Sequence, residues 1–261
     1  MGVVNVTPDS FSDGGRYFRH DAAVDHARAL VAQGADWVDV GGESTRPRAE
    51  PVPVDEELRR VIPVIESLAS EGVAVSVDTR RAAVARAALA AGARMVNDVS
   101  ASLAAEAASG GAAFVAMHMR GDPRTMQDDP RYEDVVTEVR DHLVARAGSA
   151  RAAGVAEVWI DPGIGFGKTL EQNLALLANL DVLVATGHPV LVGTSRKAML
   201  GTLAARADPA AAVPPPADRL EGSVATAVWA LARGAAMVRV HDVAATVRAV
   251  EAAGALAAPV A

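Results

Sequence analysis

The feature that most constrains the fold of this chain is an apolar run that recurs eight times and leads each time into polar residues. In the clearest example, residues 158–160 are followed by Asp161, a proline and three glycines up to Gly167. Short apolar runs bounded by turn formers are typical of strands buried on both faces of a parallel sheet. The predicted strands are 2–6, 37–40, 73–77, 95–97, 113–117, 158–160, 189–192 and 236–240.

Amphipathic segments alternate with these runs, and most of them are followed by a glycine. The predicted helices are 21–33, with Asp21 as its N-cap, 54–70, 80–91, 102–109, 132–153, 170–180, 196–205, 218–233 and 243–253. Strict alternation of strand and helix predicts an α/β fold of the (β/α)8 TIM-barrel class. We expect a single domain over 1–261, with the barrel at about 1–254 and a tail at 255–261. An open, doubly wound sheet is the alternative.

Composition excludes several classes of function. The net charge is −7 and no basic run is long enough to follow a phosphate backbone, so we expect no nucleic-acid partner. The chain has no cysteine, which excludes disulfides and thiolate chemistry. It has neither a basic leader nor an apolar stretch of about 18 residues, so we expect no membrane partner and a cytoplasmic location.

The sequence contains none of several common nucleotide-binding and catalytic motifs in complete form. The Gly-Lys-Thr at 167–169 resembles the end of a phosphate-binding Walker loop, but Pro162 stands where that loop needs glycine. Residues 163–168 lack the last glycine of a dinucleotide fingerprint. The six histidines show no metal-ligand spacing, and no Gly-x-Ser-x-Gly elbow is present. Zinc hydrolysis and serine triads are therefore not favoured.

Polar residues at the strand ends carry the chemistry that remains. Asp78, Asn97 and Asp161 each end a predicted strand, and Lys197 follows another. In a (β/α)8 barrel these ends meet at one face, where active sites form. Carboxylate and amide groups in a dry pocket suit a flat heterocycle with several N–H donors, because each unpaired donor costs ~1 to 3 kcal/mol. The alternative is that each side chain is simply a satisfied group at the rim.

A second group of polar residues lies where the ends of the barrel meet. Closure makes the eighth strand a neighbour of the first, which brings Arg239 and His241 near Asn5. Two nitrogen donors just before a helix N-terminus predict an anion site. An asparagine oxygen with no acid beside it predicts Mg²⁺ that relies on the phosphates of its ligand. The alternative is a rim ion pair between Arg239 and Asp242.

Eight motifs, in order and from residue 1 to about 253, resemble the dihydropteroate synthase family. They are MGVVNVTPDSFSDGG, DVGGESTRP, VSVDTRR, MVNDVS, MHMRGDPRTMQ, DPGIGFGKT, GTSRK and RVHDV. The resemblance implies a folate-pathway transferase that condenses 4-aminobenzoate with 6-hydroxymethyl-7,8-dihydropterin pyrophosphate. The products are 7,8-dihydropteroate and pyrophosphate, the cofactor is Mg²⁺, and the family usually forms homodimers.

The resemblance also implies roles for particular residues. It implies catalytic roles for Asp13, Arg46 and Lys197; pterin binding by Thr45, Asp78, Asn97, Met117, Asp161, Gly193 and Lys197; pyrophosphate binding by Asn5, Arg239 and His241, with Asn5 also on the metal; and aminobenzoate binding by Phe11, Pro47, Phe166 and Lys197. An arylamine is already unprotonated at neutral pH, so no strong base is needed. We hypothesise SN1-like loss of Mg-pyrophosphate, with Asp13 near the positive carbon.

Three other functions fit parts of the pattern. A non-catalytic pterin-binding homologue would keep the pocket, but Asp13, Arg46 and the complete anion set argue against it. A methyltetrahydrofolate-type methyltransferase shares the pterin pocket, but it should lack RVHDV and NVTPDSFSDGG. A class I aldolase would use Lys197 as a Schiff base, which borohydride would trap.

Overall fold

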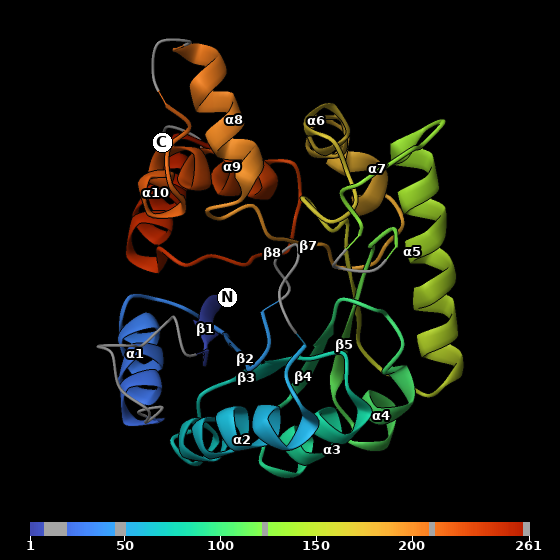
Figure 1. The fold of residues 1–261 in the computed structure, drawn as a ribbon, viewed down its shortest axis with the longest axis vertical. Coiled ribbons are helices and arrows are strands. Elements are labelled where there is room, and N and C mark those ends of the chain that lie inside the picture. Colours follow the sequence, from blue (N-terminus) through green and yellow to red (C-terminus); the bar gives the residue numbers. More distant parts are fainter. Residues whose placement is uncertain (8–19, 45–50, 122–124, 209–211, 258–261) are drawn as a thin grey trace.

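The computed structural model describes residues 1–7, 20–44, 51–121, 125–208 and 212–257 (Figure 1). Within them, the strands are β1 Gly2–Asn5, β2 Val38–Gly41, β3 Val75–Asp78, β4 Met95–Asp98, β5 Ala113–Met117, β6 Val158–Asp161, β7 Leu191–Val192 and β8 Met237–Val238. The helices are α1 His20–Ala32, α2 Val54–Ser70, α3 Ala82–Ala90, α4 Ala104–Ser109, α5 Val135–Ala152, α6 Leu170–Ala178, α7 Leu180–Val184, α8 Ala198–Ala207, the 3₁₀ helix η1 Pro216–Asp218, α9 Leu220–Ala232 and α10 Val243–Ala257.

The strands follow one another in chain order and are all parallel. β1 to β6 form one six-stranded sheet, and β7 pairs with β8. Single bridges join the two sheets at both seams, Ile160 with Val190 and Gly2 with Val240. Figure 1 shows the helices arranged around the strands in the same order. The predicted α/β barrel class is confirmed, and the chain-order succession of strands excludes the doubly wound alternative.

The apolar core has two parts. The larger lies between strands and helices and includes Val4, Ile65, Leu143 and Ile160, each completely buried. The smaller consists of side chains on the opposite faces of the strands: Met1, Met95, Ala113, Val115 and Leu191, with Trp37, Trp159 and Met237 packed against them. Because successive strand residues point to opposite faces, the second cluster fills the inside of the barrel.

Several predicted boundaries were wrong for local reasons. α5 begins at Val135 rather than 132, because the side chain of Asp134 caps it by accepting from Val136 N and Thr137 N. Asp21 is not an N-cap: α1 already begins at His20, so Asp21 lies in its first turn. The predicted helix 170–180 is broken at Asn179, whose φ of −113° and ψ of 35° are not helical.

The two last predicted elements also differ from the structure. β8 is shorter than the predicted 236–240, and α10 runs to Ala257 instead of ending at 253. Among the described helices, none combines the length and the hydropathy that crossing a bilayer demands.

Candidate active site

The register of the parallel strands aligns the polar residues at their carboxyl ends. Asn5, Gly41, Asp78 and Asn97 form one row across β1 to β4. Asp161 pairs with Met117 on the neighbouring strand. The sequence-predicted residues at strand ends are therefore brought to one edge of the barrel.

Alternation along each strand directs these residues inward. Asn97, Asp161 and Arg239 each lie two positions beyond a side chain of the inner apolar cluster, and residues two apart in a strand share a face. We call the space they surround the chamber; it is faced by Asp78, Asn97, Met117, Asp161, Gly193 and Arg239. Its floor is apolar and its upper wall is polar.

Arg239 connects three strands across the chamber. Its Nε donates to Asp39 Oδ2 at 2.6 Å, and its Nη2 donates to Asp78 Oδ2 at 2.8 Å. Burial lowers the pKa of Arg239, but the carboxylates of Asp39 and Asp78 outweigh burial and hold that pKa above its usual value. The alternative pairing of Arg239 with Asp242 is wrong, since Asp242 pairs with Arg196 at 2.6 Å.

Asp39 is a buried acid that the sequence did not single out. It is 0% exposed, and its Oδ1 has no hydrogen-bond partner in the described part of the chain. Asn97 Nδ2 donates to Asp39 Oδ2 at 3.0 Å. Because a carboxylate only accepts, this bond turns the NH₂ of Asn97 toward Asp39 and leaves the amide oxygen for another partner. Trp37, Asp39 and Gly41 lie two positions apart and so share one face of the strand, and this spacing is the sequence pattern that could have identified Asp39.

The two predicted pterin-site acids are both harder to ionise than free aspartate. Burial raises the pKa of Asp78 to about 7; Arg239 opposes the shift, while Asp39 adds to it. Burial also raises the pKa of Asp161, against the opposing charge of Lys197. Asp161 Oδ1 accepts from the backbone N–H of Gly163 at 2.7 Å, which anchors the turn that follows β6.

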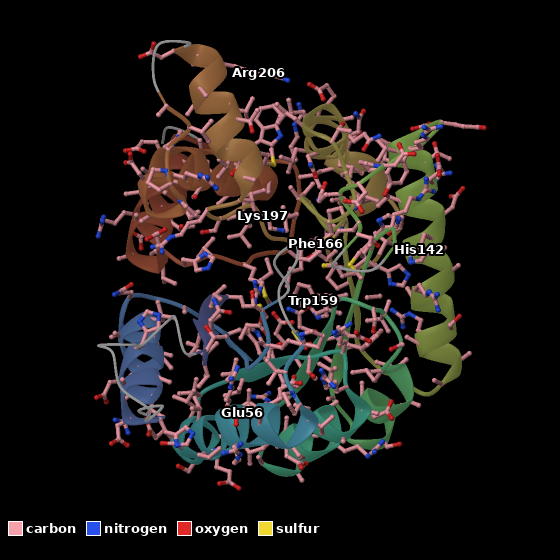
Figure 2. The ribbon with its side chains drawn as sticks, viewed as in Figure 1. Glu56, His142, Trp159, Phe166, Lys197 and Arg206 are labelled. Carbon is pink, nitrogen blue, oxygen red and sulfur yellow. The ribbon has the colours of Figure 1, made fainter. Side chains whose placement is uncertain are left out.

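Lys197 meets that turn from the β7–α8 loop. Its Nζ donates to the carbonyl of Ile164 and lies 4.7 Å from the centre of the Phe166 ring, a pair visible near the middle of Figure 2. Burial lowers the pKa of Lys197 to about 8, although Asp161 opposes the shift. A Cβ at Gly193 would lie 3.8 Å from Lys197 Nζ and 3.7 Å from Arg239 Cβ, so glycine keeps this corner of the chamber open.

Known proteins resemble this chain in sequence and in fold. Residues 1–241 match the family model described as pterin binding enzyme. The dihydropteroate synthase of Mycobacterium leprae is 51% identical over 263 residues, which cover 98% of this chain and 92% of that protein. The chain belongs to the dihydropteroate synthase family. It covers that relative almost completely, so the family likeness includes the whole barrel.

Two solved structures extend the comparison to ligands bound by relatives. The Xanthomonas albilineans dihydropteroate synthase with 4-aminobenzoic acid has a TM-score of 0.90 and 48% identity, and the match covers 99% of this chain and 93% of that one. The same enzyme in complex with 7,8-dihydropteroate has a TM-score of 0.87 and 46% identity, with the same coverage.

Lys168 is a second buried group of this dihydropteroate synthase-like barrel that the sequence did not single out. Its Nζ lies 2.9 Å from His118 Nδ1 and donates to the carbonyls of Gly163 and Phe166, both at 3.0 Å. Burial lowers the pKa of Lys168 to about 7 and that of His118 to about 2, so the imidazole is a neutral acceptor. Lys168 therefore fastens the β6–α6 turn to the end of β5.

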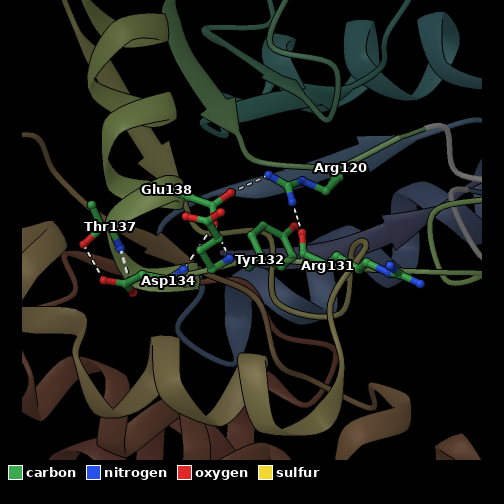
Figure 3. Close-up of a pocket in the computed structure, with 7 residues that line it drawn as sticks. Arg120, Arg131, Tyr132, Asp134, Thr137 and Glu138 are labelled. Carbon is green, nitrogen blue, oxygen red and sulfur yellow. Dashed lines mark hydrogen bonds and ion pairs between the residues drawn. The ribbon is translucent and has the colours of Figure 1, made fainter.

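A pocket is lined by Arg120 and by residues at the start of α5 and just before it (Figure 3). The Arg120 guanidinium stacks 3.9 Å above the ring of Tyr132 and pairs with Glu138 at 2.6 Å. Tyr132 Oη donates to the carbonyl of Gly167 at 2.9 Å, which holds this segment against the turn. None of the substrate-binding or catalytic residues expected from the family resemblance lines this pocket.

Asn5 stands at the seam where β1 and β8 meet. The backbone N–H of Val3 donates to the Val240 carbonyl at 3.1 Å, which confirms that the two strands are neighbours. Asn5 is half-buried, and its side chain has no hydrogen bond to any described residue. Within the described ranges no three His, Asp or Glu residues could hold a metal ion together. A lone amide oxygen fits a Mg²⁺ bound mainly by water and phosphate.

Phe11, Asp13, Thr45, Arg46 and Pro47 lie outside the described residues. Their roles in this member of the family therefore stay predictions from the sequence.

Proposed function

We propose that this chain is a dihydropteroate synthase, which condenses 4-aminobenzoate with 6-hydroxymethyl-7,8-dihydropterin pyrophosphate. The observation that carries the proposal is the chamber, in which two acids, an amide and an arginine converge from separate strands within a barrel of this family. Lys197 is added from the β7–α8 loop. The named ligands of the Xanthomonas albilineans enzyme, 4-aminobenzoic acid and 7,8-dihydropteroate, are a substrate and the product of this reaction.

In the proposed complex the pterin occupies the chamber. The carboxylates of Asp78 and Asp161 and the amide oxygen of Asn97 accept the N–H donors of the ring, while Lys197 lies over the ring. Met117 and Gly193 supply wall contacts, and Thr45 has the pterin-binding role that the family resemblance implies. Burial lowers the pKa of Lys197 to about 8, so at neutral pH the side chain still carries most of its positive charge.

The pyrophosphate binds where β8 meets β1, in contact with Arg239, His241 and Asn5. Asn5 would hold Mg²⁺ there, and the ion would supply positive charge that offsets the charge of the leaving group. The guanidinium of Arg239 is paired with the carboxylates of Asp39 and Asp78, so it is held in place before the substrate binds. Charge that develops on the departing oxygen meets donors that need not reorganise.

The reaction breaks the bond between the pterin methylene carbon and the pyrophosphate oxygen, and it forms a carbon–nitrogen bond to the arylamine. The amine then loses one proton to solvent. An SN1-like path leaves a positive carbon that the pterin ring delocalises and Asp13 stabilises. Phe11, Pro47, Phe166 and Lys197 bind the aminobenzoate, and Arg46 has the catalytic role that the family resemblance implies.

We also propose that the protein is a cytoplasmic homodimer. Alanine-rich outer helices support self-association, and the α9 side chains of Trp229 and Leu220 are 44% and 39% exposed. Sedimentation equilibrium of the purified chain tests this assignment, and a monomer at micromolar concentration would contradict it.

The activity is tested by pyrophosphate release from the pterin substrate with and without 4-aminobenzoate. Release that requires 4-aminobenzoate and Mg²⁺, and that yields dihydropteroate, is the expected result. Borohydride-dependent trapping of a carbonyl substrate on Lys197, with no pyrophosphate release, would instead assign the barrel to aldolase chemistry.

A further inference from the structure

Two consecutive residues of the β7–α8 loop pair with two consecutive residues that follow β8. Ser195 is 6% exposed, and its Oγ lies 3.1 Å from the backbone N of His241 and 3.0 Å from His241 Nδ1. Arg196 pairs with Asp242 through Nε–Oδ2 at 3.0 Å and Nη2–Oδ1 at 2.6 Å. The loop that carries Lys197 is therefore joined to the strand end that carries His241.

The two contacts of Ser195 decide where its proton goes. A backbone N–H only donates, so Ser195 Oγ accepts from the backbone of His241. The hydroxyl proton then points elsewhere, and Nδ1 of His241 is the acceptor that the described residues place within reach. The reverse arrangement, with Nδ1–H donating, would leave the hydroxyl proton without an acceptor among these residues. The neutral imidazole therefore carries its proton on Nε2.

We propose that Ser195 is a positioning residue that holds His241 in the Nε2–H tautomer, so that the ring presents a donor to the pyrophosphate. This inference rests on the proposed function, which places the pyrophosphate beside His241. The other tautomer would present a lone pair to an anion. Arg239 already donates two of its N–H groups to carboxylates. An additional N–H donor on His241 therefore increases the affinity for the anion.

The position of Ser195 is itself fixed by the neighbouring residue. Arg196 has a φ of 60°, in the left-handed region that residues other than glycine rarely adopt. Its backbone is held on both sides: Arg196 N–H donates to Ser223 Oγ and Arg219 Nη1 donates to the Arg196 carbonyl, both at 2.9 Å. Together with the Asp242 pair, these bonds keep the Ser195 hydroxyl aimed at the imidazole.

The test compares Ser195→Ala with Ser223→Ala. Both serines are buried and accept a backbone N–H from this region, but the Ser223 hydroxyl touches no imidazole in the described structure. Calorimetry measures the Kd of the pterin pyrophosphate and of the pterin alcohol, which lacks the anion. Nitrogen-15 NMR of the free protein measures which His241 ring nitrogen carries the proton.

We expect Ser195→Ala to weaken pyrophosphate-substrate binding about tenfold, spare the pterin alcohol and mix the two tautomers of His241. Ser195→Thr should restore both readouts, and Ser223→Ala should not change the tautomer. In a His241→Ala background, Ser195→Ala should have no further selective effect. An unchanged tautomer, or an equal loss for both ligands, would overturn the inference. Because the NMR readout needs no turnover, it remains decisive even if the synthase activity itself were absent.

Discussion

Gly163 occupies the tightest point of the turn after β6, so its replacement by alanine tests how that turn is held. Its φ is +63°, and an added Cβ would lie 1.9 Å from the carbonyl oxygen of His118. Alanine in the left-handed region costs ~1 to 2 kcal/mol. Relief of the overlap requires the turn to move off β5, which adds ~1 to 3 kcal/mol of packing cost. We expect Gly163→Ala to lower the free energy of unfolding by ~2 to 5 kcal/mol.

The same movement should weaken substrate binding. Gly163 N–H donates to Asp161 Oδ1 at 2.7 Å, and its carbonyl accepts from Lys168 at 3.0 Å. A displaced turn therefore displaces the Asp161 carboxylate, and small misplacements of site groups cost roughly tenfold or more. We expect the Kd of the pterin alcohol to rise at least about tenfold in calorimetric titration.

Gly111 offers a matched control for this experiment. Its φ is also +63°, but an added Cβ would have no heavy atom within 4 Å. Gly111→Ala should therefore cost only the conformational ~1 to 2 kcal/mol and leave pterin affinity unchanged. Urea unfolding of both variants in one buffer gives the comparison. Equal destabilisation by the two substitutions, with unaltered pterin binding, would refute the reasoning.

Three further predictions concern the chamber. Asp161→Asn should weaken pterin binding by roughly 10- to 100-fold, since a charge-assisted bond contributes ~1.5 to 3 kcal/mol; unchanged calorimetric affinity would contradict the proposed pocket. Arg239→Ala should lower the free energy of unfolding by ~3 to 5 kcal/mol, because it leaves Asp39 and Asp78 buried without their counter-charge, and a loss below about 1 kcal/mol in urea would contradict this. Pterin affinity should fall as the pH drops below about 7, because protonation removes the negative charge with which Asp78 accepts hydrogen bonds from the ring. Asp78→Asn should remove this pH dependence. An identical pH profile in that variant would show that another group causes the dependence.

The residues that the sequence identified share a recognisable position. Asp78, Asn97 and Asp161 each end an apolar run, and the carboxyl ends of parallel strands meet at one edge, so their convergence follows from the strand pattern. Asp39 was missed because it lies within its apolar run, and Lys168 because a lysine in a glycine-rich loop is normally solvated.

The ends of helices are also only partly predictable from the sequence. The apolar periodicity predicts α5 correctly, but its start depends on which polar side chain folds back onto the free N–H groups. Asp134 does so, which moves the start beyond Tyr132.

The amino-acid sequence by itself determined the alternation of strands and helices, the gathering of polar residues at the strand ends and the family, because these depend on local periodicity and on motifs. Only the tertiary structure decided the partners of the charged groups. Arg239 binds Asp39 and Asp78 across 200 and 161 positions of the chain, while Asp242, three residues away, binds Arg196. Ion pairs form between groups that are close in space and share burial, and that proximity exists only once the barrel has closed.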